Sequence, residues 1–193
     1  MSTSEAPPRL TLGPDDHGRT VSADEFADAD YAAPWKYERE DGRLVVMPPD
    51  GKDHIVTSSP WLDRLIVYKL NHPEVVWQVV PNAWIRVSDG TDRIGDLGVY
   101  LVETEIPDQP PAMMFEVVSP GKVSRERDYI KKRAEYHTLG VREYVIVDRF
   151  QETVTVLTYA IEGYDERVLR AADVYTSPLL PGLAVPLAEV LGR

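Results

Sequence analysis

The hydrophobic and polar residues of the chain follow two different spacings, one typical of helices and one typical of strands. Apolar positions recur at helical spacing over residues 54–70, which predicts an amphipathic helix that opens near Pro60. A second helix is predicted over residues 124–139, with Ser124 as its N-terminal cap and Gly140 as its stop. Apolar runs typical of strands cover residues 75–80, 84–87, 96–102, 112–118, 141–148 and 153–159.

Short cap and turn signals connect these elements. Ser22 and Glu25 have the spacing of a capping box and predict a short helix over residues 23–31. The Asp-Gly pair at positions 41–42 predicts a tight turn inside a hairpin of residues 37–47. This succession of helices and hairpins predicts an α/β (α+β) fold built around one central β-sheet.

Length and composition are those of a globular protein. The 193 residues suit one domain, and 43% of them are hydrophobic while 27% are charged. We expect residues 1–20, which have three prolines and no periodicity, to form a mobile arm, and residues 21–193 to form a single domain. The absence of cysteine, of a signal-peptide pattern and of any run of about 18 apolar residues favours a cytoplasmic protein with no membrane segment.

The net charge of −11 argues against a general nucleic-acid coat protein, because phosphate groups repel an acidic surface. The charge is unevenly spread, however. Acidic residues are concentrated within residues 1–30, whereas residues 122–133 carry six bases against two acids. A local phosphate-binding surface therefore remains a candidate, with Lys122, Arg125 and Lys131 as its contacts.

Two acidic residues interrupt runs that are otherwise apolar. Glu116 lies inside the segment AMMFEVV and Asp96 inside IGDLGVYL. A buried carboxylate without a partner is costly, so each needs a cation, a hydrogen-bond donor or a proton. If the two strands pair symmetrically across the loop of residues 103–111, Asp96 lies opposite Val118 and Gly98 lies opposite Glu116. The two carboxylates are then diagonal neighbours on one face, with Cα atoms roughly 7–8 Å apart, and can meet around one divalent ion.

The second predicted helix supplies a lysine that can reach these acids. Asp128, Lys132 and Tyr136 lie at successive i+4 positions and so form one stripe along the helix. From that stripe Lys132 can extend over the strand ends and neutralise charge on a scissile phosphate. Lys131 lies one position off the stripe and is expected on the surface.

An ordered series of short segments resembles a known family. The segments are, in chain order, Tyr37-Glu38, Asp41-Gly42, Val46-Met47, His54, Gly95-Asp96-Leu97, residues 115–120, Asp128, Lys132, Tyr136, residues 140–148, Tyr175 and Leu183. Taken together, over about residues 25–190, they are similar to the Uma-two family of putative restriction endonucleases, within the PD-(D/E)xK nuclease superfamily.

The resemblance implies a restriction-endonuclease-like core, in which a mixed central sheet is flanked by helices. It implies that Asp96 and Glu116 bind Mg2+ or Mn2+, helped by the backbone carbonyl of Val117. Glu38 matches a further acidic position of the family, and Lys132 matches its helical lysine. The implied activity is metal-dependent hydrolysis of DNA phosphodiester bonds by an endonuclease. Nucleases that cut both strands of DNA are commonly homodimers.

Four positions depart from the family pattern. Val118 stands where the superfamily often has a lysine, so the catalytic lysine must come from the helix, as Lys132, or be absent. Gly95 replaces the proline that usually precedes the metal-binding aspartate, and Val145 and Arg149 replace a tryptophan and a proline around a later strand.

Other functions stay open beside the nuclease. A catalytically weak nucleic-acid-binding or interaction protein that retains the fold is the alternative if Lys132 does not point at the carboxylates. A hydrolase of small phosphorylated compounds would suit the acidic surface and would need a deep pocket. A serine hydrolase is disfavoured, because Ser119 lies in no Gly-x-Ser-x-Gly motif. His54 lies where the family has a histidine, and a hydrogen-bonded helix cap is its commoner role.

Overall fold

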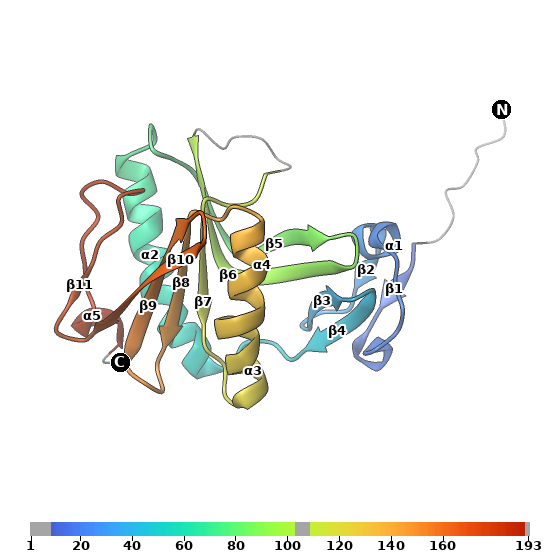
Figure 1. Ribbon diagram of the computed structural model, residues 1–193. Helices are drawn as coiled ribbons and strands as arrows, with labels where there is room; N and C mark the ends of the chain where they lie inside the picture. Colours follow the sequence, from blue (N-terminus) through green and yellow to red (C-terminus); the bar gives the residue numbers. More distant parts are fainter. Residues whose placement is uncertain (1–8, 103–108, 192–193) are drawn as a thin grey trace. The chain divides into compact units, whose positions relative to one another are not determined.

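The computed structural model describes residues 9–102 and 109–191, and it confirms a mixed α+β fold with a central mixed sheet flanked by helices (Figure 1). The chain divides into two compact units, one made of the segment up to Pro49 with Trp84–Ile94, the other of Asp50–Ala83 with the segment from Gly95 onward. Strands β5 (Val76–Ser88) and β6 (Thr91–Leu101) pair with each other and contribute residues to both units. A single domain over residues 21–193 therefore stays a prediction. No helix within the described ranges has both the length and the hydrophobicity needed to cross a bilayer.

The first unit is a small body in which part of the N-terminal segment is folded. Its elements are β1 (Thr11–Leu12), the short 3-10 helix η1 (Pro14–Asp16), α1 (Ala23–Asp28), β2 (Asp30–Tyr31), β3 (Lys36–Glu40) and β4 (Arg43–Met47). β1 pairs with β2, and Leu12 is buried in a cluster with Phe26 and Leu44. Part of the segment predicted as a mobile arm over residues 1–20 therefore has regular structure and a buried leucine, and its mobility stays a prediction. Residues 1–8 of that arm lie outside the described residues.

The local signals of this unit are confirmed. The hydroxyl of Ser22 accepts a hydrogen bond from the backbone N–H of Glu25 at 3.2 Å, and the Glu25 carboxylate accepts one from the Ser22 N–H at 2.8 Å. α1 ends at Asp28 rather than at residue 31. Asp41 and Gly42 have φ angles of 50° and 74° and form the turn between β3 and β4, as an Asp-Gly hairpin requires.

The second unit contains the larger part of the sheet and the long helices. Besides parts of β5 and β6, its elements are α2 (Lys52–Asn71), β7 (Met113–Val117), α3 (Lys122–Glu126), the π-helical turn η3 (Arg127–Lys131), α4 (Lys132–Thr138), β8 (Glu143–Asp148), β9 (Thr153–Ala160), β10 (Gly163–Arg170), β11 (Val174–Tyr175), β12 (Val185–Pro186) and α5 (Ala188–Leu191). The strand order in this unit is β10-β9-β8-β7-β6, with β7 and β8 parallel and the other pairs antiparallel. The crossover α3–η3–α4 joins the parallel strands, so the carboxyl ends of β7 and β8 meet at one edge of the sheet.

Alternation along β7 separates the two faces of this sheet. Phe115 belongs to the hydrophobic core and contacts Trp61 of α2, with 5.6 Å between the ring centroids. Its neighbour Glu116 points to the other side, where Tyr136 of α4 reaches it. Figure 1 shows α2 and the α3–α4 crossover on opposite sides of these strands. The acid in the middle of a buried strand therefore meets α4 rather than the apolar core.

Three further predicted boundaries were wrong. α2 begins at Lys52 and contains Pro60, because Gly51 in an extended conformation already starts the helix. The crossover helix begins at Lys122 rather than after Ser124. β5 joins the two strand runs predicted on either side of Asn82 into one strand, with φ of 51° at that residue.

Candidate active site

Glu116 is buried in β7, one residue before the strand ends. All five residues of this strand are buried, and Glu116 itself is 3% exposed. Its Oε1 accepts hydrogen bonds from Nζ of Lys132 at 2.8 Å and from the hydroxyl of Tyr136 at 3.0 Å. Both donors come from α4, four positions apart, and both are buried. The structure thus brings the predicted carboxylate and the predicted lysine into direct contact.

Asp128, the first member of the helical stripe, adds a second acidic group. It is 1% exposed, and its Oδ1 accepts a hydrogen bond from Nε of Arg127 at 3.2 Å. Its Oδ2 has no hydrogen-bond partner among the described residues. Burial raises the pKa of Asp128, while the charges of Lys132 and Arg127 oppose that rise. A buried carboxylate oxygen of this kind is costly unless a donor or a cation satisfies it.

The protonation of Glu116 also depends on its burial and on the charges around it. Burial raises the pKa of Glu116 to about 8, the Lys132 ammonium opposes the rise, and the charges of Asp96 and Asp128 add to it. At neutral pH the Glu116 carboxyl therefore tends to hold a proton unless a further positive charge lies close to it.

Asp96 meets Glu116 in a register that differs from the predicted one. Gly98 of β6 pairs with Met114, and not with Glu116. The prediction assumed a symmetric loop, whereas the position of β7 is also set by its parallel pairing with β8. Residues 103–108 of that loop lie outside the described residues. A shift of two residues preserves the face of the strand, and continuing the observed register sets Asp96 opposite Glu116.

The carboxylate of Asp96 is held on both of its oxygens. Oδ2 accepts a hydrogen bond from the backbone N–H of Val117 at 2.7 Å, and Oδ1 lies 3.1 Å from Nε2 of His54. The same Nε2 lies 3.6 Å from Oδ1 of Asp50. Asp50, His54 and Asp96 offer ligand atoms within 4.8 Å of one another, which makes them a candidate metal-binding group.

Asp50 was not among the residues predicted for the site, and a capping role was expected for His54. The positions of both residues depend on where α2 begins, and this helix was expected to begin near Pro60. The signal was an aspartate and a histidine four residues apart, which lie together at the N-terminal end of a helix only when that helix starts at Lys52. His54 instead extends the acidic site from α2.

The helix that carries Lys132 is irregular just before that residue. η3 has π-helical hydrogen bonding over Arg127–Lys131, between α3 and α4. Single π-helical turns inside α-helices occur frequently at functional sites. Asp128 lies within this turn and Lys132 directly follows it, so the irregularity coincides with the part of the helix that faces Glu116.

Glu38 is bound inside the first unit. It is 1% exposed, its Oε1 accepts a hydrogen bond from the N–H of Ile94 at 3.0 Å, and its Oε2 lies 3.3 Å from Nη1 of Arg93. An arginine and a backbone amide thus partner the two oxygens of the Glu38 carboxylate. The catalytic role suggested for Glu38 stays a prediction.

The three predicted nucleic-acid contacts differ in their surroundings. Lys122 and Lys131 are exposed on α3 and η3. Arg125 is half-buried, with Nη2 at 2.6 Å from Oδ2 of Asp148 and its guanidinium 5.3 Å from the ring centroid of Tyr129. Arg125 therefore anchors the end of β8, and a phosphate contact is better suited to the two lysines.

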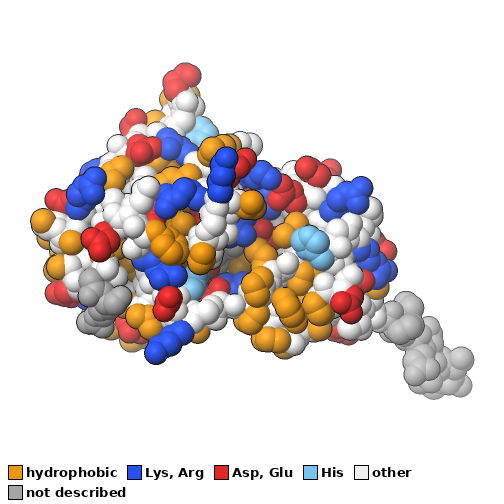
Figure 2. Space-filling view, turned by 90° about the horizontal axis from the view of Figure 1, so that it is seen from below, with side chains coloured by type: hydrophobic (Ala, Val, Ile, Leu, Met, Phe, Trp, Pro, Cys, Tyr) orange, Lys and Arg blue, Asp and Glu red, His pale blue; other side chains and the backbone are white. Residues whose placement is uncertain are grey.

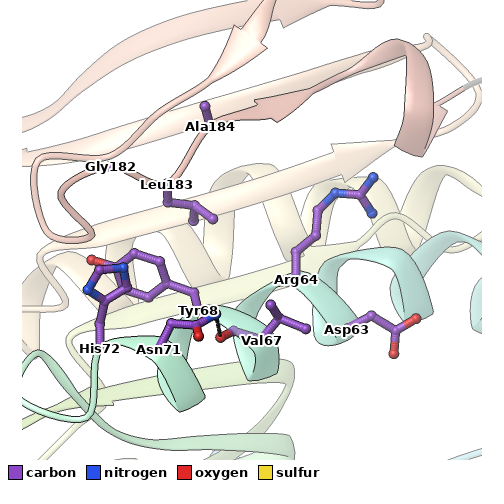
Figure 3. Close-up of a pocket in the computed structure, with 9 residues that line it drawn as sticks. All are labelled: Asp63, Arg64, Val67, Tyr68, Asn71, His72, Gly182, Leu183 and Ala184. Atoms are coloured by element: carbon purple, nitrogen blue, oxygen red, sulfur yellow. Dashed lines mark hydrogen bonds between the residues drawn. The ribbon is translucent and has the colours of Figure 1, made fainter.

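A cavity elsewhere in the second unit does not coincide with the acids. It has a volume of about 350 Å3 and lies between the second half of α2 and residues 182–184 (Figure 3). In Figure 3 the rings of Tyr68 and His72 lie against each other at one end, and Leu183 faces the helix from the other side. None of the predicted site residues lines this cavity, so it does not supply the deep pocket that a hydrolase of small phosphorylated compounds would need at the acids.

A comparison with protein families connects this geometry to known proteins. The model of the Uma2 family, described as a putative restriction endonuclease, matches residues 23–188. This chain belongs to the Uma2 family. The resemblance drawn from the ordered segments is thereby confirmed, and the match covers the elements that carry Asp96, Glu116 and Lys132.

A solved structure supports the fold of this Uma2 protein. The crystal structure of a putative nuclease from Anabaena variabilis superposes with a TM-score of 0.72, at 14% sequence identity, over 89% of this chain and 98% of that chain. At this identity the likeness concerns the fold. No curated protein matches the sequence.

We expect Glu116→Gln to leave the metal-free Uma2 protein at least as stable as the wild type at pH 7, because it removes a buried acid that Asp96 and Asp128 repel. The folded-state pKa of about 8 lies above the ordinary 4.5, so the stabilisation from the protonated carboxyl is complete below pH 4.5 and is lost as the pH rises towards 8. Relative to Glu116→Gln, the wild type should lose about 1.4 kcal/mol of unfolding free energy per pH unit in this window, measured by urea unfolding in EDTA.

Tyr136→Phe is the matched control for this measurement, since it removes the other hydrogen bond to Oε1 without removing a charge. It should keep the pH slope of the wild type. A loss of about 3–5 kcal/mol in Glu116→Gln at pH 7 would show instead that the ion pair with Lys132 dominates the site.

Proposed function

We propose that this Uma2 protein is an endonuclease that uses Mg2+ or Mn2+ to hydrolyse phosphodiester bonds of DNA. The observation that carries the proposal is the buried contact of 2.8 Å between Glu116 and Lys132, beside the charge of Asp96. It lies towards the carboxyl ends of a parallel strand pair, which is where sheets of this kind commonly bind ligands.

The donor set fits a divalent cation. The charge of Asp96 raises the pKa of both Glu116 and Asp128, and the charge of Asp128 raises that of Glu116. Oδ2 of Asp128 has no hydrogen-bond partner in the described part of the chain. A hard, oxygen-seeking cation would relieve the repulsion between the carboxylates.

Asp96 and Glu116 would hold this cation, with the backbone carbonyl of Val117 as a further ligand. His54 and Asp50 approach Asp96 from α2. Imidazole suits zinc, copper and iron better than Mg2+ or Mn2+, which prefer carboxylate and carbonyl oxygens. We therefore infer that His54 orients the Asp96 carboxylate through its Nε2, as groups just outside a metal site commonly do.

When bound, the cation would polarise the scissile phosphate and lower the pKa of the attacking water. Lys132 would place its ammonium charge where negative charge grows on the phosphate oxygens in the transition state. Glu116 must be ionised to act as a ligand, so cation binding below pH 8 or so would release its proton. Lys132 and Tyr136 would then orient the ionised carboxylate through Oε1.

A catalytically weak nucleic-acid-binding protein is the second candidate. Val118, in the place where the superfamily often has a lysine, is buried at 1% exposure and carries no charge. All catalytic charge stabilisation then rests on Lys132, whose ammonium is already paired with Glu116. A cytoplasmic location and a two-fold homodimer stay predictions from the sequence.

Calorimetry with Mn2+ should show binding to the wild type and none to Asp96→Ala, because this variant loses a charged ligand. Asp63→Ala removes an exposed acid of α2 and should bind Mn2+ like the wild type. His54→Ala should still bind, with affinity lowered about 10- to 100-fold, if His54 only orients Asp96. Equal affinity of Asp96→Ala and the wild type would refute the assignment of Asp96.

Lys132→Met should slow the cleavage of plasmid and single-stranded DNA in Mn2+ by roughly 100- to 1,000-fold, because the variant loses charge stabilisation in the transition state. Methionine keeps an aliphatic stem in the buried position, and affinity for Mn2+ should not fall, since lysine is not a ligand. Lys131→Met removes the same charge from an exposed neighbouring position and should cost only a few-fold in rate.

The same assay separates the two candidate functions. If the wild type and Lys132→Met both bind DNA and neither cuts it with any divalent metal, the enzyme proposal is wrong. The nucleic-acid-binding protein then takes its place.

A further inference from the structure

An exposed aromatic ring lies in the turn that follows β8. Phe150 is 50% exposed, and the guanidinium of Arg149 lies over its ring, 4.4 Å from the centroid. Such a pair combines a flat apolar surface with a positive charge. Proteins that bind single-stranded nucleic acids use this combination, because every base offers a π-face and every linkage a negative charge.

The turn is held firmly by a buried aspartate. Asp148 is 0% exposed, and its Oδ1 accepts hydrogen bonds from the backbone N–H groups of Phe150 at 3.0 Å and Gln151 at 3.1 Å. Its Oδ2 lies 2.6 Å from Nη2 of Arg125 and accepts a hydrogen bond from the hydroxyl of Tyr129 at 3.1 Å. The backbone that presents the ring is therefore ordered before any ligand binds, which lowers the entropic cost of binding.

The turn that carries Phe150 follows the strand next to the one that carries Glu116. β8 runs parallel to β7, with Ile146 beside Glu116 and Val147 beside Val117, so the turn with Phe150 leaves the sheet at the same edge. A second connection runs through α2. Nη1 of Arg149 lies 3.1 Å from Oδ2 of Asp53, and the next residue, His54, contacts Asp96.

The start of α3 offers similar chemistry at the same edge of the sheet. Figure 2 views the molecule from below, and on the second unit basic, acidic and hydrophobic side chains are interspersed. At the start of α3, Lys122 is exposed and Val123 is 82% exposed. A positive charge next to an apolar side chain suits a single-stranded nucleic acid, whose phosphates and bases are both accessible.

We propose that Phe150, with Arg149 behind it, is a stacking platform for an unpaired base, and that the preferred substrate is single-stranded DNA. The proposal rests on the proposed nuclease function and names its substrate class. The faces of bases inside a duplex are covered by their neighbours, so an aromatic ring on a turn can stack only on a base that is out of the helix. Stacking also adds affinity that does not depend on salt, in a protein whose net charge of −11 repels phosphate.

The test measures binding of a fluorescent 12-nucleotide single strand by anisotropy, with Ca2+ in place of Mg2+. Phe150→Ala should bind roughly 5- to 150-fold more weakly than the wild type, the range expected for the loss of one base–aromatic stack. Phe150→Trp should restore the affinity, and Phe150→Leu, which keeps an apolar side chain, should not. Ile161→Ala is the matched control, because Ile161 is 88% exposed in the turn at the other end of β9 and should be silent.

Three further comparisons isolate stacking from charge. Against an abasic oligonucleotide of the same length, Phe150→Ala and the wild type should bind equally, since no base remains to stack. The dependence of affinity on salt should have the same slope in both proteins, because no phosphate contact is lost. Affinity for a blunt duplex should change by less than twofold or so.

The outcomes separate this proposal from the nuclease function. Equal single-strand affinity of Phe150→Ala and Ile161→Ala, or an equal loss on the duplex or the abasic strand, would overturn the stacking platform. The nuclease function would still stand if Asp96-dependent Mn2+ binding and cleavage remained. A wild type that neither binds single strands nor cuts DNA would overturn both.

Discussion

The carboxylate of Glu116 must find partners in a strand that is buried throughout, and much of the second unit follows from that need. An isolated acid in such a place costs several kcal/mol. Lys132 and Tyr136 satisfy it from α4, at 2.8 and 3.0 Å, and so set which side of the crossover helix faces the sheet. The crossover in turn keeps β7 and β8 parallel, so the segments that begin at Lys122 and Phe150 leave the sheet at the edge where the acids lie.

The π-helical turn belongs to the same arrangement. A π-turn disturbs the regular ladder of backbone hydrogen bonds, which leaves carbonyl groups in need of other donors. The hydroxyl of Tyr144 donates to the carbonyl of Asp128 at 3.0 Å, from the strand face that Glu116 also occupies. The irregular turn can therefore keep Asp128 buried next to Lys132, and the sheet itself supplies the hydrogen bond that stabilises it.

Features set by neighbouring residues could be predicted from the sequence, and features set by distant ones could not. The capping box of Ser22 and Glu25 is a local signal, and the i+4 stripe ending at Tyr136 needs only a helix. The pairing of Gly98 with Met114 depends on how β7 aligns with β8, which no loop length reveals. Two contacts could not be predicted for the same reason. Asp50 lies near His54 only because α2 begins at Lys52, and Arg125 pairs with Asp148 only because β8 ends beside α3.

If the proposed function holds, the charge of the site implies an order of binding. Asp50, Asp96, Glu116 and Asp128 form an acidic cluster that Lys132 offsets only in part, and they belong to a protein with a net charge of −11. A phosphodiester approaching these carboxylates without a cation would be repelled at short range, where screening by salt is weak. Because its pKa is raised, the Glu116 carboxyl tends to hold a proton, which reduces the negative charge of the cluster. A protonated carboxyl is, however, a poor ligand. Under the proposed function, a bound cation would offset the charge of these carboxylates and attract the phosphodiester. The cation would then bind before or together with the nucleic acid, and the affinities for the two would be coupled.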